Sequence, residues 1–172
     1  MKRIFMLVAY ITCVGLALAW PAKSGLAADK VTYSGTDSTA RPGKAPKGSD
    51  VTLEVVQNED SIEITRVKLG KRTTSRCPFN GSEGDYISPG GSPGKCKAQL
   101  KEKYLVLEAI VVTSLQPTAP PVRMHTKERW QLSPDGKSLF IESAADFPDM
   151  GAGSAGMGLQ PVTRKYTRTG NQ

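Results

Sequence analysis

The 172-residue sequence predicts an all-β fold in which antiparallel strands follow one another as an up-and-down meander. After residue 28, apolar and polar residues alternate with period two along most of the chain, as they do in strands with one buried face. Turn sequences separate the runs, and no run has the length and period of a crossover helix. We expect the meander to close into a barrel, which removes exposed sheet edges; an open β-sandwich is the alternative.

The N-terminal segment, residues 1–28, has the organisation of a secretory signal peptide. A basic start precedes an apolar run over residues 4–20, and small residues end the segment at Ala27 and Ala28. We therefore expect a single β-barrel domain over residues 29–172 and a secreted or periplasmic location. No later segment is apolar enough to cross a bilayer, so no stable membrane span is expected after cleavage.

Nine strands are expected. In chain order they cover residues 31–33, 51–55, 62–69, 73–79, 96–100, 104–113, 122–132, 139–141 and 162–166. Within the third strand the apolar residues change phase after Ile64, because Val67 and Leu69 do not follow its alternation. This change indicates a bulge or a strong twist near Thr65–Arg66. The strand at 104–113 is apolar on both faces, and we expect it to be the best buried in the chain.

Turn residues support this division into strands. Short polar or glycine-containing turns are expected at residues 58–60, 70–71 and 102–103, and a proline-rich break at 116–121. The turn at 133–137 carries the strongest hairpin signal, since its proline is preset for a turn and its glycine tolerates a positive φ.

Two cysteines, Cys77 and Cys96, remain after the signal peptide is removed. In an exported chain we expect them to form one structural disulfide, and neither has a Cys or His neighbour at the spacing of a metal site. Alternation places both on the apolar face, opposite one another if their strands form a hairpin. Closing the glycine- and proline-rich loop 78–95 should stabilise the fold by about 3 kcal/mol.

The charge balance argues against a nucleic-acid partner. Loss of the signal peptide leaves 20 basic and 16 acidic residues, a net charge of +4, and these charges are interspersed along the chain. Nucleic-acid binding typically uses a basic stripe with stacking aromatic residues, whereas Trp130 is the only tryptophan after residue 28.

Glu128 is the residue whose predicted position most needs an explanation. Alternation places it with Met124 and Trp130 on the inner face, and it places Arg164 beside Tyr166 on the inner face of the last strand. Because a buried carboxylate requires a charged or hydrogen-bonded partner, we expect an interior ion pair between Glu128 and Arg164 at the floor of a ligand cavity. The alternative is that either residue lies at the barrel rim or past a bulge, in water.

Residues that could support catalysis are sparse. The single histidine, His125, falls on the outward-facing phase of its strand, and no set of residues predicts a metal site or a cofactor. An enzyme would need polar groups converging around Glu128. We therefore expect no catalytic residues.

The segment Thr126–Leu139, together with Lys165–Arg168, resembles the C-terminal hairpins of uncharacterised exported bacterial proteins with a lipocalin-like β-meander. The resemblance extends from about Lys30 to Arg168. It implies a lipocalin-like up-and-down barrel and the binding of a small hydrophobic molecule.

These observations predict an exported, non-catalytic β-barrel protein that binds a small hydrophobic molecule or a lipid. The candidate ligand-binding residues are Glu128, Arg164, Trp130, Met124 and Tyr166. The alternative is a structural or protein-interaction module with a filled interior and no ligand. Its contact surface would be the Cys77–Cys96 loop or the proline break at 116–121.

Overall fold

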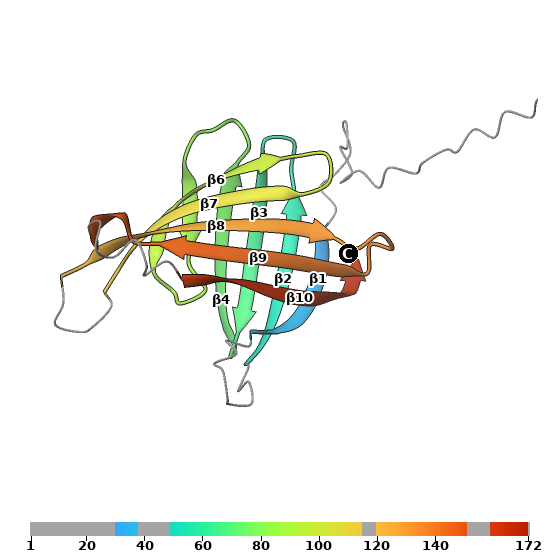
Figure 1. The fold of residues 1–172 in the computed structure, drawn as a ribbon. Helices are drawn as coiled ribbons and strands as arrows, with labels where there is room; N and C mark the ends of the chain where they lie inside the picture. The colour runs from blue at the N-terminus through green and yellow to red at the C-terminus, as the bar shows by residue number, and fades with distance from the viewer. Residues whose placement is uncertain (1–29, 38–48, 115–119, 151–158, 172) are drawn as a thin grey trace, which may run out of the picture.

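The computed structural model describes residues 30–37, 49–114, 120–150 and 159–171; the expected signal peptide lies outside them. Ten strands, each antiparallel to its neighbours, form one sheet in the order β4-β3-β2-β1-β10-β9-β8-β7-β6-β5 (Figure 1). The strands are β1 (Lys30–Asp37), β2 (Ser49–Gln57), β3 (Ser61–Lys68), β4 (Lys71–Pro78), β5 (Gly84–Ile87), β6 (Pro93–Leu100), β7 (Leu105–Thr113), β8 (Val122–Leu132), β9 (Ser138–Asp146) and β10 (Leu159–Asn171). A 3-10 turn, η1 (Pro148–Met150), follows β9. The prediction of an all-β antiparallel meander is confirmed.

The sheet wraps around on itself into a nearly closed barrel. Strands β2, β3 and β4 cross β7, β8 and β9 at a steep angle, so that the inner faces of the two halves pack together (Figure 1). Burial of these faces removes the apolar surface from water and supplies the main driving force for folding. The buried core contains Tyr33, Val51, Leu53, Val55, Ile62, Ile64, Cys77, Tyr86, Cys96, Ala98, Leu105, Leu107, Ala109, Val111, Trp130, Leu139, Ile141 and Tyr166. Among the described residues, no helix has the length and hydropathy needed to span a bilayer.

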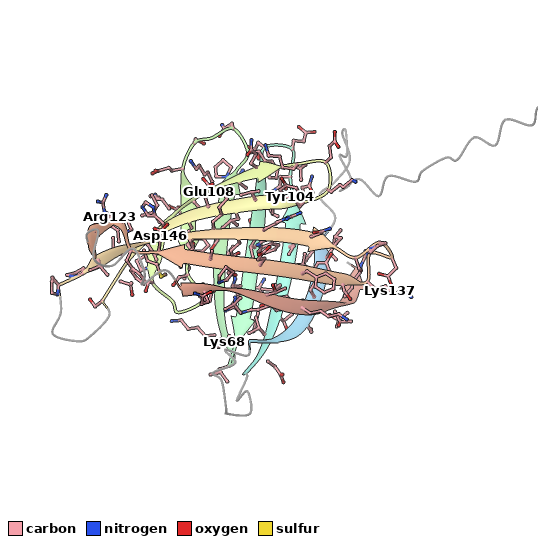
Figure 2. The ribbon with its side chains drawn as sticks, in the orientation of Figure 1. Lys68, Tyr104, Glu108, Arg123, Lys137 and Asp146 are labelled. Atoms are coloured by element: carbon pink, nitrogen blue, oxygen red, sulfur yellow. A yellow bond between two sulfur atoms is a disulfide. The ribbon has the colours of Figure 1, made fainter. Side chains whose placement is uncertain are left out.

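The two ends of the barrel differ in their connections. At one end, short turns over residues 58–60, 79–83, 101–104 and 133–137 join successive strands. At the other end lie the tight β3–β4 turn and the β5–β6 loop. Lys137 marks the end with the short turns and Lys68 the opposite end (Figure 2).

Strand β5 was not expected from the sequence. It lies within the loop that the disulfide encloses and pairs with β6, from Gly84 opposite Cys96 to Ile87 opposite Pro93. The surrounding glycines and prolines obscure its alternation, because only Tyr86 and Ile87 are large apolar residues in this short strand.

The barrel closes at a seam between β4 and β5, the two strands at the ends of the hydrogen-bonded order. At the seam the Ile87 N–H donates to Ser75 Oγ at 2.9 Å. The backbones approach so closely that a Cβ atom at Gly84 would lie 1.9 Å from the Arg76 carbonyl oxygen. Glycine is therefore required at this position of β5.

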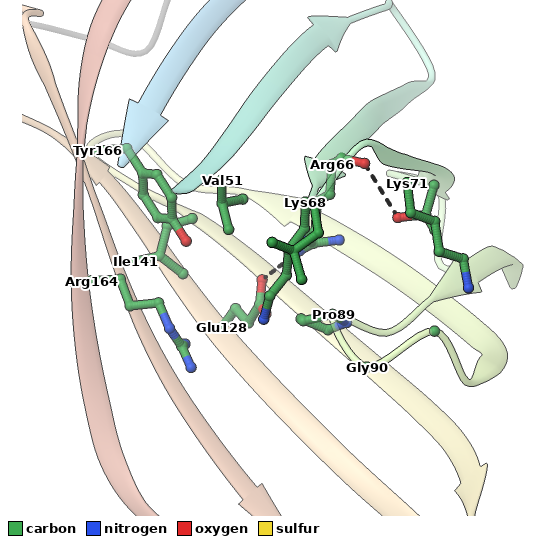
Figure 3. Close-up of a pocket in the computed structure, with 13 residues that line it drawn as sticks. Val51, Arg66, Lys68, Lys71, Pro89, Gly90, Glu128, Ile141, Arg164 and Tyr166 are labelled. Carbon is green, nitrogen blue, oxygen red and sulfur yellow. Dashed lines mark hydrogen bonds and ion pairs between the residues drawn. The ribbon is translucent and has the colours of Figure 1, made fainter. Parts of the chain in front are cut away.

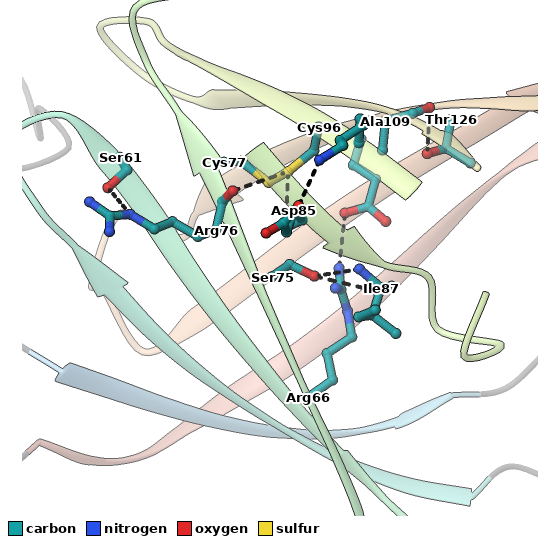
Figure 4. Close-up of a disulfide and its surroundings, with 12 residues drawn as sticks. Ser61, Arg66, Ser75, Arg76, Cys77, Asp85, Ile87, Cys96, Ala109 and Thr126 are labelled. Atoms are coloured by element: carbon teal, nitrogen blue, oxygen red, sulfur yellow. Dashed lines mark hydrogen bonds and ion pairs between the residues drawn. A yellow bond between two sulfur atoms is a disulfide. The ribbon is translucent and has the colours of Figure 1, made fainter. Parts of the chain in front are cut away.

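A disulfide spans the same seam. Cys77 on β4 and Cys96 on β6 are joined with a Cα–Cα distance of 5.3 Å, and both are buried (Figure 4). The predicted pairing and the apolar face are confirmed. The strands of the two cysteines do not form a hairpin with each other, because β5 follows β4 and pairs with β6 in its place. The disulfide thus ties together the two ends of the sheet.

Strand β3 corrects the expected bulge near Thr65–Arg66. Its register runs without a shift from Ile62 to Lys68 against β2 and from Ser61 to Lys68 against β4. The alternation that begins at Ile62 continues, so Arg66 is buried. Leu69, taken in the sequence as part of the strand, lies in the β3–β4 turn with φ of 50° and is 84% exposed.

Strand β7 corrects a second expectation, that its two faces are both buried. Leu105, Leu107 and Val111 are fully buried on the inner face. On the outer face, Ile110 is 41% exposed and Val112 is 54% exposed. The outer face of a barrel strand has no second layer to cover it, so apolar residues there remain in contact with water.

Candidate functional site

The Glu128 side chain lies inside the barrel and is 5% exposed, as the alternation of β8 predicts. Its Oε2 lies 3.4 Å from Arg66 Nη2 (Figure 3). The same oxygen accepts a hydrogen bond from Trp130 Nε1 at 2.8 Å. The carboxylate therefore has both a charged and a neutral partner in the interior. The alternative that Glu128 lies in water at the rim is wrong.

Arg66 is the partner that the sequence reasoning missed. It was hidden by the expected change of phase in β3, whereas uninterrupted alternation from Ile62 through Ile64 would have placed it inside. Burial by itself lowers the pKa of the Arg66 guanidinium, but the charge of Glu128 and the nearby Tyr86 phenol raise it above its usual value. Arg66 is thus a permanent cation in the barrel interior.

Arg164, the predicted partner of Glu128, lies on the neighbouring wall. Its Nη1 donates to Ser143 Oγ at 3.1 Å, from β10 to the adjacent strand β9. Arg164 and Glu128 line the same cavity, so the prediction that both residues face one interior space is consistent with the structure. The ion pair seen at Glu128 nevertheless involves Arg66, which stands on β3 across the barrel.

Tyr86, on β5, packs against this ion pair. The Arg66 Cζ atom lies 5.7 Å from the centroid of its ring. Burial, followed by the charge of Glu128, raises the pKa of the Tyr86 phenol to about 12. The hydroxyl therefore remains protonated at neutral pH.

A cavity of about 230 Å³ lies next to these groups and opens at the β3–β4 turn and the β5–β6 loop. Its lining combines the charged groups with apolar walls. The lining residues are Val51, Arg66, Lys68, Leu69, Lys71, Thr73, Pro89, Gly90, Gly91, Glu128, Ile141, Arg164 and Tyr166 (Figure 3). Drug-sized ligands occupy about 300–1,000 Å³, so the cavity fits a small molecule or one end of a longer one.

Two of the five predicted ligand-binding residues lie off the cavity. Trp130 is fully buried in the core, where its indole N–H donates a hydrogen bond to the Glu128 carboxylate. Met124 is partly buried and packs against the core cluster. Glu128, Arg164 and Tyr166 do line the cavity, and the sequence reasoning overlooked Lys68 and Lys71 at its mouth.

The interior is consequently divided. Trp130, Leu105 and Leu139 are fully buried and occupy the part nearer the short turns. The cavity occupies the part nearer the β3–β4 turn. The described residues therefore do not fill the interior throughout, as the alternative prediction of a filled interior required.

A larger hollow, about 700 Å³, is lined by residues of β6 to β10 and of the 79–83 turn. Its charged side chains pair with one another in water: Glu108 lies 3.3 Å from Lys97 and 3.0 Å from Lys127. His125 also lines it, as expected for the outward phase, with Nδ1 3.7 Å from Asp146 Oδ1. Within the described part of the chain, no three His, Cys, Asp or Glu side chains are grouped as metal ligands.

Comparison with solved structures supports the β-barrel fold. The fold matches that of a protein titled REP1-NXSQ fatty acid transporter with a TM-score of 0.52 and 12% identity, covering 82% of this chain and 94% of that one. It also matches apo Caenorhabditis elegans lipid binding protein 8, with a TM-score of 0.46 and 9% identity over 70% and 72% of the two chains. No family model and no curated protein matches the sequence. At 12% identity the likeness to the first structure shows the fold alone. The expected relation to exported bacterial proteins has no sequence match.

Proposed function

We propose that this protein is an exported, non-catalytic barrel that binds a small hydrophobic molecule or a lipid in its interior cavity. The observation that carries the proposal is a cavity with apolar walls, Val51 and Ile141, that ends on the interior charges of Arg66, Glu128 and Arg164. A few polar groups at the end of an apolar pocket are the usual arrangement for orienting an amphipathic ligand.

Two further observations support this function. A similar barrel belongs to a protein whose title names it a fatty acid transporter, which makes lipid the first class of ligand to test. The buried disulfide across the barrel seam suits an oxidising compartment, in agreement with the expected signal peptide.

The proposal is tested by filling the cavity. In Ile141→Phe the larger side chain occupies cavity volume. We expect the amphipathic fluorophore 1-anilinonaphthalene-8-sulfonate, an aromatic sulfonate, to bind this variant at least about tenfold more weakly than the wild type. Val112→Phe is the matched control, because it adds an aromatic ring to the exposed outer face of β7. Equal binding by both variants and the wild type would place the fluorophore outside the barrel and refute the proposal.

A further inference from the structure

Trp130 lies at the inner end of the cavity, on the side of the short turns, without lining it. Among the described residues it is the largest fully buried side chain, and it stands opposite Ile141 where β8 pairs with β9. Ile141 lines the cavity, and so does Glu128, which precedes Trp130 by two positions on the same face of β8. The indole N–H donates to the Glu128 carboxylate at 2.8 Å. Trp130 therefore lies directly behind two residues of the cavity wall.

The side of Trp130 that faces away from the cavity is packed with fully buried apolar side chains. Leu105 stands opposite it on β7, and Leu139 occupies the next inward-facing position of β9 toward the 133–137 turn. Protein cores are close-packed, so an indole held by such neighbours and by a hydrogen bond does not move aside for a ligand without cost. The cavity is thus bounded by a fixed ring at its inner end and opens at the β3–β4 turn.

The volume of the cavity determines how much of a ligand it encloses. A cavity of about 150 Å³ accommodates a six-carbon ring, so a cavity of about 230 Å³ encloses about nine heavy atoms. Each methylene group moved from water into an apolar site strengthens binding about fourfold. Methylene groups that project past the mouth remain in water and add little.

We propose that Trp130 closes the inner end of the cavity and thereby sets the length of the ligand, an apolar chain of which about nine heavy atoms are enclosed. This inference rests on the proposed function and specifies the size of ligand that the cavity takes. Trp130 determines specificity through the depth of the cavity, behind the residues that line it.

The test is a series of uncharged ligands, the 1-alkanols from 1-hexanol to 1-undecanol, titrated into the delipidated protein by isothermal titration calorimetry. In the wild type, affinity should rise about fourfold per methylene up to about 1-octanol. Beyond this break in the series, the rise should fall below about twofold per methylene, because the added groups stay in water.

Two substitutions shorten the ring in steps. Trp130→Phe removes about three side-chain heavy atoms and Trp130→Leu about six, and the space they vacate extends the cavity inward. We expect the break to move by about one methylene in Trp130→Phe and by about two or three in Trp130→Leu, with 1-hexanol affinity within about twofold of the wild type. Both variants lose the hydrogen bond to Glu128, so a shift graded with size separates the lost volume from the lost bond.

The matched control is Ile62→Ala. Ile62 is also fully buried, but Ile64 separates it along β3 from Arg66, which lines the cavity. The substitution leaves a void in the core and should not move the break. Urea midpoints of the ligand-free variants establish that each is folded during the titration; if Trp130→Leu is not, Trp130→Phe and the wild-type series carry the test.

The outcomes separate this inference from the proposed function. A break at the same chain length in the wild type and the Trp130 variants, or an equal shift in Ile62→Ala, would overturn the role of Trp130 and leave the binding function standing. A wild-type affinity that rises fourfold per methylene throughout the series would do the same. Failure of the wild type to bind any alkanol or 1-anilinonaphthalene-8-sulfonate would refute the binding function and this inference together.

Discussion

At the scale of single residues, the feature that distinguishes this barrel is the charged group at its centre. Glu128, Arg66 and Trp130 come from two strands on opposite sides of the barrel and meet through one carboxylate oxygen. A buried ion pair adds little net stability, because desolvation of both charges offsets their attraction. The pair is therefore weak evidence for a stabilising role, and it lies beside the cavity that we propose binds the ligand.

The first prediction concerns Glu128→Gln. The amide oxygen can still accept from Trp130, but the Arg66 charge is left buried without a counter-charge, so we expect a loss of about 3 kcal/mol in the free energy of unfolding. Urea denaturation followed by Trp130 fluorescence measures it. Glu142→Gln, on the exposed face of β9, should change stability by less than about 0.5 kcal/mol. If the two variants are equally stable, Glu128 is not engaged in the interior.

The second prediction concerns pH. Asp149 accepts hydrogen bonds from the Arg123 guanidinium and backbone N–H, and these lower its pKa to about 2. Because this pKa is depressed in the folded state, the stabilisation is complete above about pH 4 and is lost as the pH falls toward about 2. Asp149→Asn should therefore be less stable than the wild type at pH 7 and equal to it near pH 2. Urea midpoints across this range test it, and a pH-independent difference would contradict it.

At the scale of strands, closure of the barrel depends on the contact between β4 and β5, the two strands at the ends of the sheet order. The β4–β5 seam has few hydrogen bonds, and a covalent link and a close backbone contact hold it. The disulfide and Gly84 therefore both support closure of the barrel at the β4–β5 seam. The cavity opens beside this seam, since Lys71 at its mouth begins β4 and Pro89 follows β5.

The third prediction concerns Gly84→Ala. The added methyl group would overlap the Arg76 carbonyl oxygen and force the seam apart, so we expect a loss of about 1–3 kcal/mol, as for other overpacked sites. Gly170→Ala is the control, because a Cβ there meets nothing within 4 Å. Guanidinium denaturation compares them. Equal midpoints would show that the strands separate at the seam without cost.

At the scale of the whole molecule, the two ends of the barrel have different roles. The short-turn end is packed with large apolar side chains and stabilises the fold. The opposite end carries the cavity and its basic mouth.

The fourth prediction concerns export. When the full chain is expressed with its N-terminal segment in a bacterial host, mass spectrometry should find a periplasmic product that begins at residue 28 or 29. Thiol titration of that product should detect no free cysteine, because Cys77 and Cys96 are oxidised. A variant lacking residues 2–28 should remain in the cytoplasm. Retention of the full-length chain, or two free thiols in the exported product, would contradict the prediction.

Local sequence determined much of this protein. Period-two alternation placed Glu128 and Tyr166 on the inner face, His125 on the outer face, and both cysteines where they could pair, because side-chain direction along a strand depends only on position. The turn at 133–137 likewise follows from its own proline and glycine. These features need no information from distant parts of the chain.

Only the tertiary structure decided which groups meet. The pairing of Glu128 with Arg66 links residues 62 positions apart and depends on how the sheet curls, which no local pattern encodes. Strand β5 is too short to be recognised alone and exists because β6 and the seam support it. The cavity is what remains after the side chains of opposite walls have packed, so its size and its charges follow from closure of the barrel.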